Sequence, residues 1–330
     1  MPPVKVVVTS AIGAHCLEHI AAVGKHVRVT DVSSLFRGEL TGDAGARARL
    51  DAALAEAEVI YGLRLPQNVL ARAPRLKWIQ VMSAGVDRYL DAEMRDSPVK
   101  MTNVSGIHAT PIGEFVLGLI LMFVKLAPQC FELKEQVKWQ RVYPSVLSDK
   151  TLGVVGLGSI GREIARLGKA FGMRVVATRR SARPGDHARY VDTLLPADHL
   201  GTLLRDSDFV VLAVPFTPET QRLIGDAQLR QMRRSAFLIN IARGGIVDED
   251  ALVRALTQKT IAGAGLDVFA TEPLPADSPL WHLPNAIISP HISGAREDYV
   301  LRATELFVEN LRRYLAGKRL VNVVDKRRGY

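Results

Sequence analysis

Three segments late in the chain carry residue types that suit the reduction of a 2-keto acid. They read Asn240-Ile-Ala-Arg243-Gly-Gly, Asp267-Val-Phe-Ala-Thr-Glu272-Pro and Ser289-Pro-His291-Ile-Ser-Gly294. This chemistry needs a cation that holds the carboxylate and polarises the carbonyl, and a proton donor for the developing alkoxide. Arg243 and His291 are of the right types, and Glu272 is suited to orient the histidine and favour its imidazolium form.

Each of these residues also has an ordinary structural interpretation. Arg243 would make a surface ion pair, Glu272 would cap a turn before Pro273, and His291 would be a hydrogen-bonded structural histidine. Each segment, however, follows a predicted strand, and an open α/β sheet places its ligand crevice at the carboxyl ends of its strands. The joint position therefore favours one shared site.

A glycine-rich turn precedes these segments. The strand-like Leu152-Gly-Val-Val155 runs into Gly156-Leu-Gly158-Ser159-Ile160-Gly161, after which apolar residues recur at helical spacing. In such a turn the first glycine allows a tight bend, the second admits a pyrophosphate, and the third permits close helix packing. The N–H groups of the helix start then face the phosphates. We expect a dinucleotide site, the alternative being a glycine turn without a ligand.

The end of the next predicted strand bears on the choice of dinucleotide. An NAD enzyme usually places an acidic residue there, on the adenosine ribose. This chain has Thr178, Arg179 and Arg180 instead. Guanidinium groups form charge-assisted bonds to a 2′-phosphate, so the pattern favours NADP(H), with NAD(H) as the weaker alternative. In that alternative both arginines are solvated loop residues.

The elements that must position these residues alternate between strands and helices. This rhythm is typical of α/β folds with doubly wound parallel sheets, and it restarts after residue 150, which predicts two such domains. A long apolar helix opens at Thr110-Pro111, and an irregular arm spans Phe131–Ser148. Shorter helices are expected over His15–Val23 and Ala46–Leu54, and a last helix covers about Ala295–Leu315. The expected strands are Val4–Val8, Val27–Val29, Val59–Tyr61, Trp78–Val81, Leu152–Val155, Arg174–Thr178, Phe209–Val214, Ala236–Asn240, Gly263–Val268 and Ala286–Ser289, with Leu320–Val324 as a final edge strand.

Bulk properties exclude several other classes of protein. The 330 residues suit two domains. The formal charge of +9 is spread along the chain without interleaved aromatic residues, so we expect anionic small molecules rather than nucleic acid as ligands. The apolar stretch Phe115–Val124 is too short to cross a membrane. Two cysteines without metal-ligand spacing, together with no visible export signal, predict a cytoplasmic protein without a metal site.

Several motifs in fixed order resemble the D-isomer-specific 2-hydroxyacid dehydrogenase family: GLGSIG, NIARGGIVDEDAL, GLDVFATEP and SPHISG. The resemblance covers nearly the whole chain, including Ser83-Ala-Gly-Val-Asp87 and Gly106-Ile-His-Ala-Thr-Pro-Ile-Gly-Glu114. It implies a Rossmann-type dinucleotide-binding domain, residues 106–291, inserted into a flavodoxin-like substrate domain made of residues 1–105 and 292–330.

The resemblance also implies roles for individual residues. Arg243 would bind and polarise the keto acid, His291 would be the acid/base, and Glu272 would hold and tune it. Backbone amides of the Ser83, Ala84 and Gly85 loop would grip the substrate carboxylate, and Asp267 would bond the nicotinamide amide. The cofactor would further contact Ser159, Ile160, Val214, Pro215, Ile241, Ala242 and Gly294. The family suggests a homodimer built partly on the helix after Pro111 and the arm near Trp139.

The arginine pair departs from the NAD-using pattern of this family. It favours members that resemble glyoxylate and hydroxypyruvate reductases, acting on a small 2-keto or 2-hydroxy acid. Two alternatives stay open: an NAD-dependent D-2-hydroxyacid or 3-phosphoglycerate dehydrogenase, and a dinucleotide-sensing interaction protein without turnover. The pocket wall is not fixed by the sequence, and Arg64, Met82, Trp139 and Trp281 are candidates only. Of these, Trp281 is expected to be a core residue.

Overall fold

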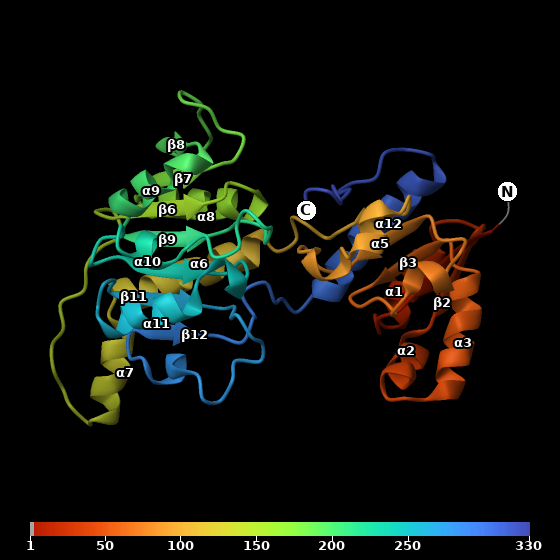
Figure 1. The fold of residues 1–330 in the computed structure, drawn as a ribbon, viewed down its shortest axis with the longest axis horizontal. Coiled ribbons are helices and arrows are strands. Elements are labelled where there is room, and N and C mark those ends of the chain that lie inside the picture. The colour runs from red at the N-terminus through yellow and green to blue at the C-terminus, as the bar shows by residue number, and fades with distance from the viewer. Residues whose placement is uncertain (1–2) are drawn as a thin grey trace. The chain divides into compact units, whose positions relative to one another are not determined.

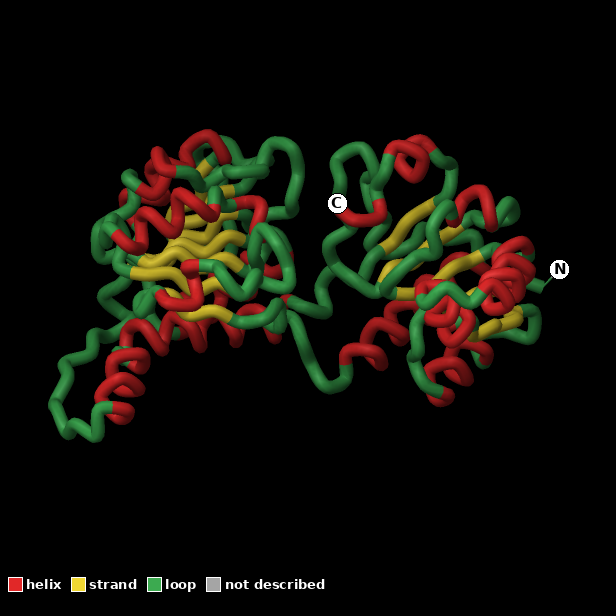
Figure 2. Tube along the Cα trace, turned by 60° about the horizontal axis from the view of Figure 1, so that its bottom comes forward, coloured by secondary structure: helices red, strands yellow, loops and turns green. Residues whose placement is uncertain are grey.

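The computed structural model describes residues 3–330, and the chain divides into two compact units. Unit 1 combines the N-terminal stretch up to Ile107 with Arg296–Tyr330, and unit 2 is His108–Ala295. Both boundaries lie a few residues later in the chain than the sequence analysis placed them. In each unit a sheet is enclosed by helices (Figure 1, Figure 2).

Unit 1 contains a five-stranded parallel sheet in the order β2-β1-β3-β4-β5. This is the flavodoxin-like order. The strands are β1 (Val4–Val8), β2 (Val27–Asp31), β3 (Val59–Gly62), β4 (Trp78–Val81) and β5 (Lys100–Thr102). The helices are α1 (Ala14–Ala21), α2 (Ser33–Leu40), α3 (Ala44–Ala55), α4 (Val69–Arg72), η1 (Asp87–Tyr89), α5 (Ala92–Asp96) and α12 (Tyr299–Leu315).

Alternation along the strands divides the core of unit 1 between the two faces of its sheet. Val6 and Val8 pack with α1 and α12, whereas Val7 packs with α2 and α3. Successive side chains of a strand point to opposite faces, so a strand covered on both faces is apolar throughout. Phe307 of α12 stacks on Tyr61 with ring centroids 4.2 Å apart, which fixes the C-terminal helix to this unit.

Unit 2 contains a seven-stranded parallel sheet in the order β12-β11-β10-β9-β6-β7-β8. The strands are β6 (Thr151–Val155), β7 (Arg174–Thr178), β8 (Thr193–Leu195), β9 (Phe209–Leu212), β10 (Phe237–Asn240), β11 (Gly263–Leu266) and β12 (Ala286–Ile288). The helices are α6 (Ala109–Val124), α7 (Ala127–Glu135), α8 (Ser159–Ala170), η2 (Ala197–His199), α9 (Leu200–Asp206), α10 (Asp226–Leu229), η3 (Gly244–Ile246), α11 (Glu249–Thr257) and η4 (Pro279–His282).

The sheet of unit 2 is buried between two helical layers. Leu152 and Val154 of β6 pack with α6 and α8, whereas the next residue, Val155, packs with α9 and α11. The order of the strands reverses between β6 and β9, since the chain runs outward from β6 first through β7 and β8 and then through β9. Doubly wound sheets bind their ligands at such a switch point.

Several expected elements differ from the structure. The last helix begins at Tyr299 rather than Ala295, and α2, which was not predicted, buries only Phe36. The predicted edge strand Leu320–Val324 is not a strand but makes one antiparallel bridge, between Val323 and Thr102. Its neighbour Val324 donates to the carbonyl of Met101 at 2.9 Å.

The predicted irregular arm is helical over its first part, since α7 continues to Glu135. No residue of α7 is buried, and this helix with the loop after it extends from the body of unit 2 (Figure 1, Figure 2). In that loop Val137 is 94% exposed and Trp139 is fully exposed. Across residues 3–330 no single helix is long and apolar enough to span a membrane, although the bent pair α6 and α7 passes by length and composition.

Candidate active site

Most of the site residues predicted in unit 2 lie at or just after the carboxyl ends of strands in one parallel sheet, and Glu272 lies six residues beyond the end of β11. Gly156 follows β6, Arg179 follows β7, and Val214 comes soon after β9. Arg243, Asp267 and His291 follow β10, β11 and β12 in the same way. Because the strands are parallel, their carboxyl ends share one edge of the sheet.

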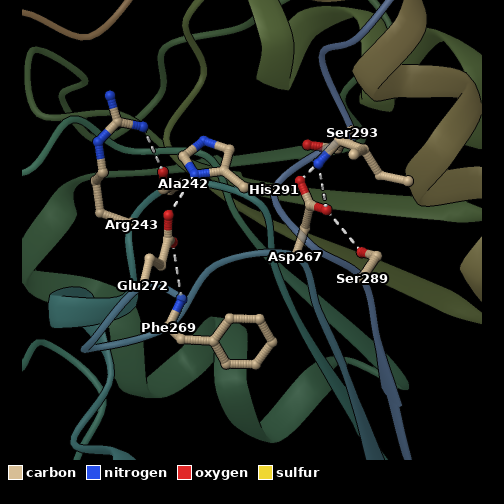
Figure 3. A network of polar contacts seen from close by, with 9 residues as sticks. Ala242, Arg243, Asp267, Phe269, Glu272, Ser289, His291 and Ser293 are labelled. Atoms are coloured by element: carbon tan, nitrogen blue, oxygen red, sulfur yellow. Dashed lines mark hydrogen bonds and ion pairs between the residues drawn. The ribbon is translucent and has the colours of Figure 1, made fainter. Parts of the chain in front are cut away.

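His291 and Glu272 form a hydrogen-bonded pair at this edge (Figure 3). His291 Nδ1 lies 2.8 Å from Glu272 Oε2, and the other carboxylate oxygen, Oε1, accepts from the backbone N–H of Phe269 at 3.1 Å. The backbone of Phe269 thus holds the Glu272 carboxylate through the oxygen that does not contact the histidine. The bond of Glu272 to Nδ1 leaves Nε2 as the ring nitrogen that can meet a ligand.

His291 has a left-handed backbone conformation, with φ of +56°. This conformation is uncommon for residues other than glycine, although histidine is among those that adopt it more often. Its side chain is 48% exposed, compared with 37% for Glu272. The imidazole is therefore open to solvent-borne ligands while one of its nitrogens is held.

Asp267 fixes the loop that carries His291. Its carboxylate is fully buried and accepts from Ser289 Oγ at 2.6 Å, Ile292 N at 2.9 Å and Ser293 N at 2.8 Å (Figure 3). Three donors on both sides of His291 therefore hold its backbone. The bond predicted from Asp267 to a nicotinamide amide stays a prediction.

Arg243 is the N-cap of the short helix η3, which follows β10. Its Nη1 donates to the carbonyl of Ala242 at 2.7 Å, and its own carbonyl accepts from Asn240 Nδ2 at 3.0 Å. Asn240 Oδ1 also accepts from Ala242 N at 3.1 Å. The amide of Asn240 thus replaces backbone partners in this turn and holds both Ala242 and Arg243.

The glycine turn has the geometry that a dinucleotide phosphate requires. A Cβ on Gly156, where φ is +97°, would lie 2.6 Å from the Ala213 carbonyl oxygen, and one on Gly161 would lie 2.0 Å from the Gly156 oxygen. Both positions therefore need glycine for packing. Gly158, the N-cap of α8, differs because a Cβ there would meet nothing within 4 Å. It faces open space beside free first-turn N–H groups, which fits an approaching pyrophosphate.

The predicted arginine pair stands at the end of β7, next to this turn. Thr178 is buried, and its carbonyl accepts from Gly156 N at 3.1 Å. Arg179 is one-third exposed and its Nη2 lies 3.5 Å from Asp186 Oδ2. Arg180 is exposed, and its charge helps the Thr217 hydroxyl to lower the pKa of Glu219.

The other predicted cofactor residues surround the same edge. Ile241 is 5% exposed, whereas Val214 is half-buried and Pro215 is exposed. Gly294 is explained by packing within unit 2, because a Cβ there would lie 2.8 Å from Cδ2 of His108 at the start of α6.

The predicted substrate loop lies in unit 1, after β4. Ser83 is buried, and its Oγ donates to the carbonyl of Gly85 at 2.8 Å. Asn103 Nδ2 donates to the carbonyl of Ala84 at 2.7 Å, and Val104 N donates to that of Ser83 at 3.2 Å. The carbonyls of the loop are therefore tied to the segment after β5.

A cavity of about 610 Å³ adjoins the histidine pair in unit 2. Its wall is largely apolar, with Glu272 and His291 as the ionisable groups. The lining residues are Phe269, Glu272, Pro273, Leu274, Trp281, Ile288, Ser289, Pro290 and His291. Trp281 is half exposed, so it lines this cavity rather than filling a core.

Comparison with known proteins identifies the family. Residues 117–293 match the model of the D-isomer specific 2-hydroxyacid dehydrogenase NAD binding domain. The chain belongs to the D-isomer-specific 2-hydroxyacid dehydrogenase family. The resemblance of the glycine turn and the three strand-end motifs to this family is therefore confirmed, as is the class of fold.

Individual relatives of this dehydrogenase carry more than one activity. A glyoxylate/hydroxypyruvate reductase B of Pectobacterium carotovorum is 38% identical over 288 residues, covering 83% of this chain and 87% of the relative. A D-3-phosphoglycerate dehydrogenase of Methanocaldococcus jannaschii is 33% identical over 266 residues, covering 80% of this chain but 50% of that enzyme.

A solved structure of the same family matches the whole fold. It is a D-isomer specific 2-hydroxyacid dehydrogenase from Xanthobacter autotrophicus in complex with NADPH and MES. Its TM-score is 0.84 at 30% identity, and the match covers 99% of this chain and 100% of that one.

Four supporting residues were given no role in the sequence analysis: Asn103, Asp186, Asn240 and Ser289. The roles of the two asparagines could have been predicted, because an Asn at the end of a buried strand or directly after it commonly bonds nearby backbone groups. Ser289 was quoted in its motif, but its bond to Asp267 depends on the register of neighbouring strands. Asp186 gave no sequence signal, since its contact with Arg179 depends on the path of a loop.

Proposed function

We propose that this dehydrogenase reduces small 2-keto acids of the glyoxylate and hydroxypyruvate class, giving the D isomer where the 2-hydroxy acid is chiral, and that it prefers NADP(H) over NAD(H). The 2.8 Å contact between His291 Nδ1 and Glu272 Oε2 carries the proposal, because it leaves one histidine nitrogen for a substrate. The Pectobacterium relative and the NADPH complex of the Xanthobacter structure support the substrate class and the cofactor.

The proposed roles at the substrate follow from the held side chains. Arg243 binds the carboxylate and polarises the keto oxygen, since a guanidinium offers two parallel donors. The imidazolium of His291 donates its Nε2 proton to that oxygen as negative charge develops there. Glu272 keeps the other proton on Nδ1 and stabilises the imidazolium before transfer. The amides of the loop at Ala84 and Gly85 are proposed to hold the substrate carboxylate.

The proposed cofactor contacts lie along the carboxyl edge of the unit 2 sheet. Gly158 and the first turn of α8 would hold the pyrophosphate, and Arg179 with Arg180 would hold a 2′-phosphate. The dinucleotide, when bound, supplies the hydride for the keto carbon. One hydride and one proton make the hydroxy acid, and His291 regains its proton from solvent.

A keto acid panel tests the proposed reaction. Glyoxylate, hydroxypyruvate, pyruvate and phenylpyruvate are supplied with NADPH and with NADH, and absorbance at the nicotinamide band is followed. We expect turnover with glyoxylate and hydroxypyruvate and a higher kcat/KM for NADPH. Dinucleotide binding without turnover of any acid would instead support a dinucleotide-sensing protein.

The dinucleotide preference has a separate test. Replacing Arg179 and Arg180 together by glutamine removes up to two charge-assisted bonds, each worth about 1.5–3 kcal/mol, or roughly ten- to a hundred-fold in affinity. We expect NADPH to weaken strongly and NADH little. Equal losses for both, or a wild-type protein that prefers NADH, would contradict the NADP(H) assignment.

The Methanocaldococcus relative favours one alternative activity, the NAD-linked oxidation of 3-phosphoglycerate. That reaction would require a site for the substrate's own phosphate in addition to Arg243. The absorbance assay of the keto acid panel also tests this alternative, with 3-phosphoglycerate and NAD⁺ as the substrates. A higher kcat/KM for NADH formation than for glyoxylate reduction would favour the 3-phosphoglycerate activity over the proposed one.

We further propose a homodimer in a reducing, cytoplasmic compartment. Exposed apolar residues on the arm support the dimer, namely Val137, Trp139 and Tyr143. Cys16 and Cys130 are both free thiols, which suits a reducing compartment. Light scattering after size exclusion tests the dimer, and deletion of arm residues 137–146 should yield monomers if the arm forms the interface.

A further inference from the structure

The loop after β7 brings a carboxylate against the first arginine of the proposed phosphate site. Asp186 Oδ2 lies 3.5 Å from Arg179 Nη2. The same oxygen accepts from Arg183 N at 3.1 Å, and Asp186 N donates to the Arg183 carbonyl at 3.0 Å. A closed turn therefore holds the carboxylate in place, so the contact does not depend on a chance side-chain rotamer.

The guanidinium of Arg179 keeps unused donor capacity. Its Nε is buried without a hydrogen-bond partner among the described residues, and its Nη2 lies 3.5 Å from Asp186 Oδ2. An arginine carries five donors, so one loose ion pair does not saturate it. A phosphate can therefore bind the same guanidinium while the Asp186 carboxylate is still present.

The negative charge of Asp186 acts on a phosphate bound to Arg179. A 2′-phosphate held by Arg179 would stand a few ångströms from the carboxylate, and like charges at that distance repel. Both side chains are more than 30% exposed, so solvent and salt reduce this repulsion without removing it. A dinucleotide without the 2′-phosphate brings no charge to this position and should not sense Asp186 strongly.

We propose that Asp186 is a specificity-determining residue that limits the affinity for 2′-phosphorylated dinucleotides. It thereby reduces the difference between the affinities for NADP(H) and for NAD(H). The inference rests on the proposed function in one respect, namely that Arg179 faces the 2′-phosphate. Arg180 has a carboxylate of its own nearby, since its charge contributes to the lowered pKa of Glu219 after the larger effect of the Thr217 hydroxyl. Both arginines thus have nearby acidic groups.

Calorimetric titration of the full-length protein tests this role without turnover. Wild type and Asp186→Asn are titrated with NADP⁺, NAD⁺ and 2′,5′-ADP. Asparagine keeps one oxygen that can accept from Arg183 N, removes the charge and replaces the second carboxylate oxygen by an NH₂ group. We expect Asp186→Asn to bind NADP⁺ and 2′,5′-ADP about three- to ten-fold more tightly, with NAD⁺ changed by less than about two-fold.

The matched control is Asp149→Asn, which removes an exposed carboxylate just before β6, at the opposite edge of the same parallel sheet. It should leave all three dissociation constants unchanged. An equal gain in Asp149→Asn would show a general field effect and overturn the inference. Unchanged or weaker NADP⁺ binding by Asp186→Asn would also overturn it, the latter because Asp186 would then orient Arg179 for phosphate.

The same titrations separate this inference from the proposed function. If wild type binds NAD⁺ more tightly than NADP⁺, the cofactor preference is wrong, yet a selective gain for NADP⁺ in Asp186→Asn still supports the local repulsion. If wild type prefers NADP⁺ and Asp186→Asn leaves the ratio unchanged, the preference stands and the role of Asp186 is wrong.

Discussion

Glu272 accepts two hydrogen bonds of different kinds, and its replacement by glutamine cannot preserve both. Oε1 accepts from Phe269 N at 3.1 Å and Oε2 meets His291 Nδ1 at 2.8 Å. A glutamine has one acceptor oxygen and one donor NH₂ group. If its oxygen stays on Phe269 N, its NH₂ group faces Nδ1 and favours the tautomer with the proton on Nε2 only. If its oxygen turns to Nδ1, the N–H of Phe269 faces another donor.

Each of the two orientations of the glutamine amide has a free-energy cost that can be estimated. An unsatisfied, partly buried N–H costs about 1–3 kcal/mol, and exchanging a charge-assisted bond for a neutral one costs roughly 1 kcal/mol more. Because the side chains of His291 and Glu272 are partly exposed, solvent reduces the cost of exchanging the charge-assisted bond. Because loss of a positioned acid–base group lowers rates about 10²- to 10⁴-fold, a misoriented histidine should fall at the lower end of that range. We therefore expect kcat of Glu272→Gln to fall roughly 10²-fold.

The assay is the pH profile of kcat and kcat/KM for glyoxylate reduction. Glu249→Gln is the matched control, because Glu249 Oε2 also accepts from a backbone N–H, that of Ala270 at 3.0 Å, and Glu249 bonds no histidine among the residues that the structure describes. Its amide can turn its oxygen toward Ala270 N. The control should keep the wild-type profile, and a Glu272→Gln enzyme with wild-type kcat at every pH would refute the positioning role.

Three further outcomes follow. His291→Ala should lower kcat about 10²- to 10⁴-fold while NADP⁺ binding by calorimetry stays unchanged, and a sound variant with wild-type kcat would remove the acid role. Arg243→Lys should lower kcat/KM for the keto acid roughly 30- to 100-fold with little change in KM for NADPH, and the reverse pattern would assign Arg243 to the nucleotide. Burial alone would raise the pKa of Asp192, but bonds from Val175 N and Lys169 Nζ lower it. Asp192→Asn should therefore reduce Tm at neutral pH. The difference in Tm from wild type should vanish as pH falls below 3.8, the ordinary pKa of an aspartate, because the wild-type carboxylate then becomes protonated. A difference in Tm that is constant with pH would contradict this linkage.

Most of the fold follows from local patterns in the sequence. Strands buried on both faces, such as Val59–Gly62 and Phe209–Leu212, are continuous apolar runs that are recognisable without partners. The missed elements lack such a pattern. The strand β8 has three residues, and α2 contains Gly38 and buries a single side chain. Their conformation depends on neighbours that the local sequence does not specify.

The candidate site was predictable in its residue types and less so in its hydrogen bonds. The order of motifs identified Arg243 and His291, because strand ends in a doubly wound sheet gather at one edge. The hydrogen bonds of the buried Asp267 carboxylate could not be predicted from the sequence. Its three bonds to the 289–293 segment arise from the pairing of β11 with β12 and from the turn that follows. Such contacts between segments have no signature within either segment.

The proposed reaction is the reduction of a 2-keto acid by NADPH to a D-2-hydroxy acid at the His291–Glu272 pair. Hydroxypyruvate tests it most directly, because its reduction product, glycerate, is chiral. Purified protein is incubated with NADPH and hydroxypyruvate, and the glycerate is resolved on a chiral column against the NADPH consumed. We predict D-glycerate in a one-to-one ratio with NADPH oxidised, and its loss in His291→Ala. L-glycerate, or no NADPH consumed with hydroxypyruvate or glyoxylate, would contradict the account.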